Sequence, residues 1–373
     1  WGAQNVEKVR CVVGSTLFMT LIGGTVVAAF GVIFAKQILL LLGTDPNVMH
    51  LSLPYVQWML AGSPLLFVYI IYTSILRGVG DSITPLIALS LTSAIGLVIT
   101  PVLIAGYFGF PKLGIVAPAV ATIVGYMAVL LFLAVYLNKR NHPLKPDRAL
   151  LRQIRHQPKL SKIILRLGIP TGIQMVTTSV AGLVIVGLVN RYGSEATAAY
   201  GAVNQVLNYI QFPALSIAIA ASIFAAQAIG AGKSDLLNKV TRTALGMNVV
   251  FTGGLVILGY LASKYLMALF ITDPKVVELG QQLLFIVLWS IVFFGASAIF
   301  ASIMRASGTV TVPMIINIVA IILIEVPCAY LFSHWWGLQG IWYAYALAFF
   351  SLCLMQGLYY QFVWKKKTIT ALV

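Results

Sequence analysis

The segment SILRGVGDSITP, residues 74–85, recurs in altered form as SIMRASGTVTVP, residues 302–313. Arg77 aligns with Arg305 at an offset of 228 positions (305 minus 77), and the glycine and the final proline of each segment keep that offset. A TDP tripeptide precedes both segments at the same offset. A fixed offset across several motifs indicates an internal repeat, so we expect two halves with similar folds.

The composition indicates a membrane protein, because 60% of the residues are hydrophobic and only 9% are charged. Segment 65–76, LLFVYIIYTSIL, is apolar on every side, which excludes the alternating strands of a membrane barrel. A spanning helix needs about 20 apolar residues. The sequence predicts ten such helices, at roughly 13–35, 53–76, 82–107, 113–137, 168–190, 197–228, 243–267, 281–304, 310–333 and 338–364.

The net charge of +15 reflects topology and not nucleic-acid binding. If the spans alternate, one side of the membrane receives 19 of the 24 Lys and Arg residues, as is typical of the cytoplasmic side. No basic cluster carries the interleaved aromatic residues of single-strand binders. We therefore expect the linker and the C-terminus to be cytoplasmic, a lipid bilayer as the surroundings, and no nucleic-acid partner.

The repeat also predicts the domain organisation. In the second half, two apolar helices precede the loop at 230–242, whereas the equivalent loop at 2–10 has none before it. We expect the chain to lack the first two of twelve helices, which would form two six-helix bundles related by a pseudo-twofold axis along the membrane normal. The predicted parts are an N-terminal bundle at 1–137, a basic cytoplasmic linker at 138–167 and a C-terminal bundle at 168–373. Two interpretations of the linker are open: it is an irregular loop, or it contains a short helix that lies on the membrane surface.

Several recurring residues have structural explanations. Asp45 and Asp273 of the two TDP motifs are placed to cap helices, and ion binding is the alternative. Arg77 and Arg305 end helices on the basic side, where the helix dipole favours a cation. A latch between Arg77 and Asp81 is the alternative for the first copy.

Glu325 is the one acidic residue inside a predicted span, in IINIVAIILIEVPCAYLF. An ionisable side chain at that depth is costly, so its default interpretation is functional. We predict that Glu325 binds the coupling cation. The alternative is that it lies near a helix end and reaches water, since Pro327 follows closely.

Uncharged polar residues gather in the second half. Asn204, Asn208 and Gln211 share one helix side with Tyr209 adjacent, Gln174 and Thr178 are one turn apart, and Asn317 lies eight residues before Glu325. We predict that this set lines a cavity, while hydrogen bonding between helices is the alternative for any one member. No zinc spacing, phosphate loop or Ser/His/Asp set occurs, so we expect no enzyme activity, no metal site and no cofactor.

The chain resembles the multidrug and toxic compound extrusion (MATE) family. The resemblance rests on AYGAVNQVLNYIQFPALSIAIAASIFAAQAIGAGKSDLLNKV, on the paired TDP and R-x-x-G motifs and on FPKLGIVAPAVATIVGY. It implies a secondary antiporter that exports small organic, often cationic, compounds in exchange for H⁺ or Na⁺ by alternating access. It also implies a bacterial inner-membrane location, and we expect a monomer.

Two departures from the family pattern limit this comparison. One branch has an N-x-x-L-D-P pattern in its fifth helix, where this chain has GLVITP with Gly96 and Thr100, and Thr100 is a further cavity candidate. Another branch has an acidic residue in the seventh helix, which GIPTGIQMVTTSV lacks. The alternative function is a lipid-linked oligosaccharide flippase, against which we count the absence of Arg or Lys from the apolar cores.

Overall fold

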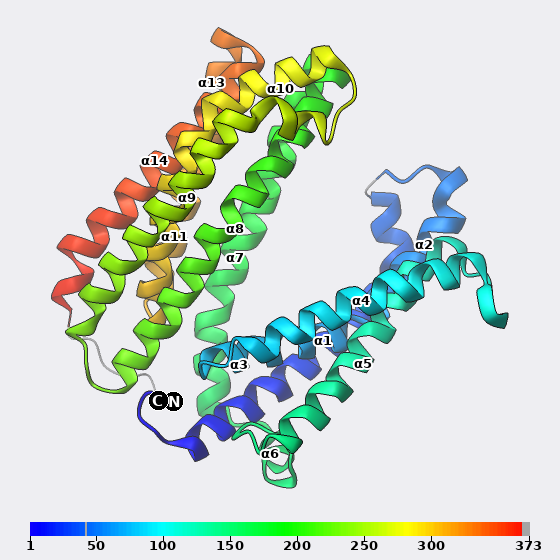
Figure 1. The fold of residues 1–373 in the computed structure, drawn as a ribbon, viewed down its shortest axis with the longest axis vertical. Coiled ribbons are helices and arrows are strands. Elements are labelled where there is room, and N and C mark those ends of the chain that lie inside the picture. Colours follow the sequence, from blue (N-terminus) through cyan, green and yellow to red (C-terminus); the bar gives the residue numbers. More distant parts are fainter. Residues whose placement is uncertain (42, 368–373) are drawn as a thin grey trace. The chain divides into compact units, whose positions relative to one another are not determined.

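The computed structural model describes residues 1–41 and 43–367, and the described chain is almost entirely helical. It divides into an N-terminal unit, Trp1 and Asn5–Ile164, and a C-terminal unit, Gly2–Gln4 with Leu165–Val373. Figure 1 shows that each unit consists of long helices lying side by side.

The N-terminal unit contains the first six α-helices and the start of the seventh. In chain order its elements are α1 (Val6–Leu41), α2 (Pro46–Ala61), α3 (Ser63–Gly78), α4 (Ile83–Ala105), the 3₁₀ turns η1 (Tyr107–Gly109) and η2 (Gly114–Val116), α5 (Ala117–Lys139), α6 (Arg148–Gln153) and the beginning of α7 (Pro158–Val189).

The C-terminal unit contains most of α7 and the remaining helices. They are η3 (Asn190–Tyr192), α8 (Ser194–Gly230), α9 (Leu236–Ala268), α10 (Pro274–Val287), η4 (Leu288–Ser290), α11 (Ile291–Ala306), α12 (Thr311–Val319), η5 (Ala320–Glu325), α13 (Val326–Trp336), α14 (Leu338–Phe362) and η6 (Trp364–Lys366).

The prediction of an all-helical membrane protein is confirmed. In the described part of the chain, nine helices are long and apolar enough to span a bilayer, and α2 with α3 forms a tenth span bent by 44°. The bend falls at Gly62, two residues before Pro64, which has no amide hydrogen for the helix. The repeat-related position of the second half carries the 3₁₀ turn η4, so both copies interrupt this span at the same place.

The recurring motifs begin and end helices as the sequence predicts. Asp45 accepts a hydrogen bond from the Asn47 amide at 2.7 Å, and Asp273 accepts one from the Lys275 amide at 2.9 Å. These are N-terminal caps, each followed by a proline in the first turn. The predicted capping role is therefore confirmed.

The arginine motifs end their helices with the same hydrogen bonds in both copies. Gly80 and Gly308 have positive φ angles of 94° and 84° and donate to the carbonyls of Arg77 and Arg305. A left-handed residue of this kind closes a helix and favours glycine. Asp81 pairs with His142 at 4.0 Å, so the alternative latch with Arg77 is not formed among the described residues.

The short helix of the linker is docked on α1. Asp147 caps α6 through the Leu150 amide at 2.8 Å and forms an ion pair with Arg10 at 3.3 Å. Leu150 is buried, and Gly14 lets the end of α6 approach, because a Cβ there would overlap the carbonyl of Gln153. The expected membrane-surface helix is thus held by protein contacts, and α7 begins earlier than the predicted span, at Pro158.

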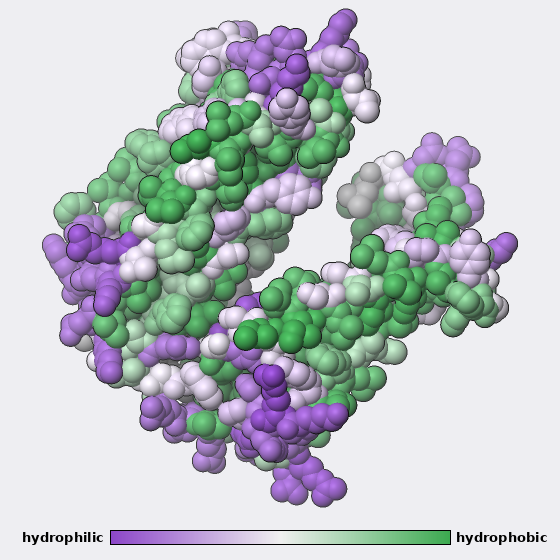
Figure 2. All heavy atoms as spheres, viewed as in Figure 1, coloured by the Kyte–Doolittle hydropathy of each residue, from purple (hydrophilic) through white to green (hydrophobic). Residues whose placement is uncertain are grey.

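Each unit has its own apolar core. Leu76, Val129 and Leu133 are buried in the N-terminal unit, and Val203, Leu284 and Ile341 are buried in the C-terminal unit. Many large apolar side chains are nevertheless exposed along the helices. Figure 2 shows that this hydrophobic surface covers the sides of the helices while hydrophilic residues gather at their ends, as expected for spanning helices.

Candidate functional site

Glu325 ends a π-helical turn in the middle of the span Thr311–Trp336. The Val326 amide donates to the Ile321 carbonyl, five residues back, and Pro327 has no amide to continue the α pattern. The result is a widened turn between α12 and α13. Such turns are often found at functional sites, because they redirect a side chain and leave backbone carbonyls without their usual partners.

Glu325 lies within electrostatic range of two tyrosines from other helices. It is half-buried and interacts electrostatically with Tyr200 of α8 and Tyr345 of α14. The two tyrosine hydroxyls are hydrogen-bonded to each other at 2.9 Å. Asn204, one turn after Tyr200, donates to the Tyr200 backbone carbonyl at 3.0 Å and also interacts with the Tyr200 side chain. We call Tyr200, Asn204, Glu325 and Tyr345 the carboxyl–tyrosine cluster.

Within residues 1–41 and 43–367, the Glu325 carboxyl makes no hydrogen bond and no ion pair. A carboxylate without a partner inside a membrane span costs several kcal/mol. An ionised Glu325 would therefore attract a cation or a proton. The two tyrosine hydroxyls and the Asn204 amide supply further polar atoms from neighbouring helices.

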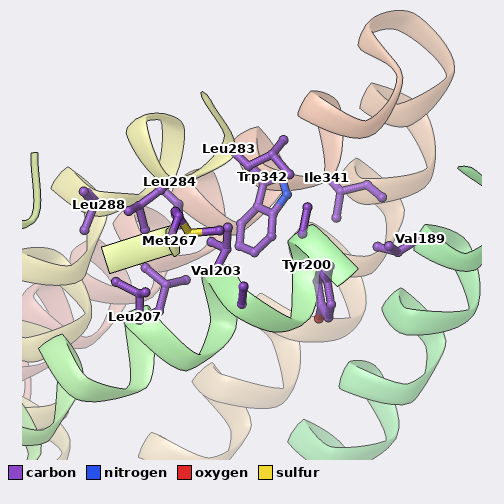
Figure 3. Close-up of a cluster of buried hydrophobic side chains, with 14 of the residues drawn as sticks. Val189, Tyr200, Val203, Leu207, Met267, Leu283, Leu284, Leu288, Ile341 and Trp342 are labelled. Carbon is purple, nitrogen blue, oxygen red and sulfur yellow. The ribbon is translucent and has the colours of Figure 1, made fainter. Parts of the chain in front are cut away.

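An aromatic and aliphatic core supports the cluster on one side. The fully buried Trp342 lies with its ring centroid 5.3 Å from that of Tyr200 and 5.5 Å from that of Tyr345. Figure 3 shows the Trp342 side chain beside Leu283 and Val203, with Tyr200 on the same helix as Val203. The two tyrosines therefore join a dry core to a polar site, and their hydroxyls are held in place by packing.

The first copy of the repeat has no equivalent cluster. Pro101 aligns with Pro327 at an offset of 226 (327 minus 101), which places Ile99 at the position of Glu325 and Ala119 at that of Tyr345. Ile99 packs against an apolar cluster formed by Leu103, Ala117 and Ala121. The same part of the fold is thus built without a carboxyl, so the fold does not require Glu325.

A second polar contact joins α7 to α11. Arg305 donates to the Gln174 side chain at 3.4 Å and to the Ser302 hydroxyl at 3.4 Å, and it is only partly exposed. Its counterpart Arg77 donates to Ser74, the residue equivalent to Ser302. Arg305 is thus a partly exposed cation in the last turn of α11, and its side chain contacts Gln174 of α7.

Among the described residues, the remaining predicted cavity residues make no hydrogen bond to the carboxyl–tyrosine cluster. Thr178 is exposed and donates to the backbone carbonyl of Gln174. Asn208 and Tyr209 are exposed on α8, where the Tyr209 ring lies 6.2 Å from Phe212 and 6.5 Å from Phe270. Tyr209 therefore contributes to an aromatic group.

Three further candidates are half-buried. Gln211 lies on α8, Thr100 lies on α4 of the N-terminal unit, and Asn317 lies on α12 with a buried Oδ1 that has no partner among the described residues. Of the predicted set, Asn204 and Glu325 each interact with Tyr200. In the described ranges, no group of three or more His, Cys, Asp or Glu residues is arranged to hold a metal ion.

Sequence reasoning missed Tyr200 and Tyr345. Tyr200 could have been found, because it lies four residues before Asn204 on the same helix side. Tyr345 could have been noticed as a tyrosine at the position of Ala119 in the first copy, but its pairing with Tyr200 depends on how α8 and α14 pack.

Spanning helices built from a sequence repeat, with an ionisable residue inside one span, are typical of membrane transporters. The MatE family model matches residues 1–102 and 170–331. The chain belongs to the MatE family, which confirms the resemblance seen in its motifs.

Two curated relatives and one solved structure illustrate the similarity. The chain is 46% identical to the Probable multidrug resistance protein YoeA of Bacillus subtilis, over all of this chain and 81% of that protein. It is 30% identical to the Probable multidrug resistance protein YpnP of the same organism, over 90% of this chain and 73% of that protein. A mutant of the Vibrio cholerae MATE transporter VcmN superposes with a TM-score of 0.87 at 18% identity, over 99% of this chain and 87% of that one, which shows the shared fold.

Proposed function

We propose that this protein is a secondary multidrug antiporter that exports small organic, often cationic, compounds in exchange for H⁺ or Na⁺. The family and the names of the relatives support multidrug efflux. The observation that supports cation coupling is the unpaired Glu325 carboxyl beside Tyr200 and Tyr345. Its proposed setting is the bacterial inner membrane, with a monomeric transporter whose linker and C-terminus are cytoplasmic.

In the proposed exchange, the coupling ion and the cationic drug compete for the same carboxyl, that of Glu325. When Glu325 is ionised, it attracts either the coupling ion or the positive charge of a drug. Binding of one neutralises the charge and removes the attraction for the other. Alternating access then moves whichever cation is bound, so the two fluxes are coupled in opposite directions.

Tyr200 and Tyr345 have a positioning role in this proposal. Because their hydroxyls share one hydrogen bond, one hydroxyl hydrogen is left to donate to the Glu325 carboxylate. Such a donor would stabilise the ionised state while the coupling ion leaves and before the drug arrives. Asn204, Asn208, Gln211, Gln174, Thr178, Asn317 and Thr100 remain the proposed polar lining of the substrate path.

The test uses the intact gene in everted membrane vesicles that respire and become acid inside. With a fluorescent pH reporter in the lumen, added ethidium should release protons from the wild-type vesicles and not from Glu325→Gln vesicles. A sodium gradient replaces the proton gradient in a second arm. The matched control is Glu278→Gln, since Glu278 lies exposed in the first turns of α10. If the Glu325→Gln variant keeps the ethidium-dependent ion flux seen in the wild type, whether of protons or of sodium, the proposed role of Glu325 is contradicted.

The second candidate is a lipid-linked oligosaccharide flippase, which the half-buried Arg305 favours because a flippase needs a cation for its phosphate. Ethidium-dependent ion flux would exclude it. If wild-type vesicles respond in neither arm, phosphate-linked substrates should be tested next, with Arg305→Gln as the variant expected to fail.

A further inference from the structure

A groove of about 440 Å³ opens at the end of the C-terminal unit where α9 begins and α14 ends. α9 contributes Arg242 and Leu245, α11 contributes Phe300, α14 contributes Gly357, and Lys365 lies in η6. The groove is separate from the carboxyl–tyrosine cluster and shares no residue with it.

The mouth of this groove is cationic and not neutralised. Arg242 is exposed and makes no hydrogen bond or ion pair with any residue in the described ranges. Lys365 donates to the Gln361 side chain at 2.8 Å and lies 5.4 Å from the centroid of the Tyr360 ring. No Asp or Glu of the described chain lines the groove itself; Asp235 lies in an adjoining pocket that Lys365 also lines, and it forms no ion pair with Lys365. Two cations facing one space without a carboxylate create a site for an anion.

The body of the groove is apolar and lies deeper in the spans. Leu245 follows Arg242 by three residues along α9, and Gly357 precedes Lys365 by eight residues along the last span. A Cβ at Gly357 would stand 3.4 Å from the ring of Phe300, so a larger side chain there would occupy the groove. The charged side chains of the groove therefore lie at the helix ends, and its apolar side chains lie closer to the middle of the membrane.

We propose that this groove binds an anionic phospholipid of the phosphatidylglycerol type. Its phosphate would lie between Arg242 and Lys365, and one acyl chain would lie along Leu245, Phe300 and Gly357. The end that carries the groove is rich in basic residues, with Lys233, Lys239, Lys366 and Lys367 nearby in sequence, as expected on the cytoplasmic side where anionic lipids act. A bound lipid would connect the ends of α9, α11 and α14.

The experiment measures lipid binding to the purified full-length protein by native mass spectrometry. Phosphatidylglycerol, phosphatidylcholine and glycerol phosphate are titrated separately. We expect phosphatidylglycerol to bind most tightly, and Arg242→Gln with Lys365→Gln to weaken it about thirty-fold, which corresponds to about 1 kcal/mol per cation. Each single variant should lose about five-fold, which keeps the test available if the double variant does not fold. Lys366→Gln is the matched control, since it removes a neighbouring charge that does not line the groove.

Gly357→Leu tests the apolar half. It leaves both cations in place and fills the groove, so phosphatidylglycerol binding should fall by at least the same factor as in a single charge variant. Equal affinity for phosphatidylcholine, unchanged binding in the double variant, or equal affinity for glycerol phosphate would each overturn the proposal. Unchanged binding in Gly357→Leu would overturn the placement of the acyl chain and with it the lipid site.

Discussion

Replacing Glu325 by isoleucine should stabilise the protein and abolish transport. The first copy of the repeat already carries Ile99 at this position, so isoleucine is compatible with the local fold. Among the described residues, Glu325 makes no hydrogen bond or ion pair that the substitution would remove. The variant therefore loses an isolated carboxyl and gains apolar contact.

The size of the effect follows from the cost of acidic residues in membranes. An acidic residue at the centre of a span costs about 3 kcal/mol, and isoleucine contributes about −0.5 kcal/mol. Because water that reaches such a carboxyl lowers this cost, we expect a gain below the full difference, about 2 kcal/mol. Such a gain should raise the unfolding temperature by a few degrees.

Thermal unfolding of the purified protein, followed by tryptophan fluorescence, measures the stability, and ethidium efflux from cells measures transport. The control is Glu278→Ile, which makes the same substitution at an exposed position and should change neither property much. A Glu325→Ile variant that is less stable than wild type would show that the carboxyl supports the fold. A variant that still transports would show that coupling lies elsewhere, and either result refutes the reasoning.

Three other perturbations address the cluster and the linker. Tyr345→Phe removes one hydroxyl of a pair held at 2.9 Å, and we expect about five-fold slower ethidium efflux, corresponding to about 1 kcal/mol, with unchanged expression. Asp147→Ala should destabilise the protein by about 1 kcal/mol, measured as a lower unfolding temperature, because it removes the cap on the Leu150 amide. The hydrogen bond from that amide lowers the pKa of Asp147, so the cap stabilises the protein fully above pH ~4 and its contribution is lost as the pH falls further. If the unfolding temperature of the variant depends on pH in this range just as that of the wild type does, the capping role is contradicted. Gly14→Leu should release α6 and speed proteolysis within the linker, since a side chain there overlaps the carbonyl of Gln153; unchanged cleavage would argue against the docking.

The spans and their ends could be predicted because they depend on local sequence. About 20 apolar residues predict a spanning helix, and TDP predicts its first turn wherever it occurs. The bend at Gly62 could not be placed, because an apolar run through Pro64 reads as one helix. The docking of α6 was missed for another reason, since it depends on Arg10 and Gly14 more than 130 residues away.

The candidate site was predicted only in part. Glu325 stood out because a carboxyl within an apolar run is recognisable from sequence alone. Its neighbours Tyr200 and Tyr345 come from two other helices, and tyrosines are common in membrane spans, so no local pattern selects them. The contact of Arg305 with Gln174 was not predicted, because the two residues lie on different helices and 131 positions apart in sequence.

The most direct test of the shared carboxyl measures proton release from the purified full-length protein in weakly buffered detergent solution. Addition of ethidium to the wild-type protein should release about one proton per molecule of bound drug if H⁺ is the coupling ion. If Na⁺ is the coupling ion, ethidium should instead displace bound radioactive sodium. We expect neither release from Glu325→Gln. Release that is equal in wild-type and Glu325→Gln protein would contradict the claim that drug and coupling ion compete for Glu325.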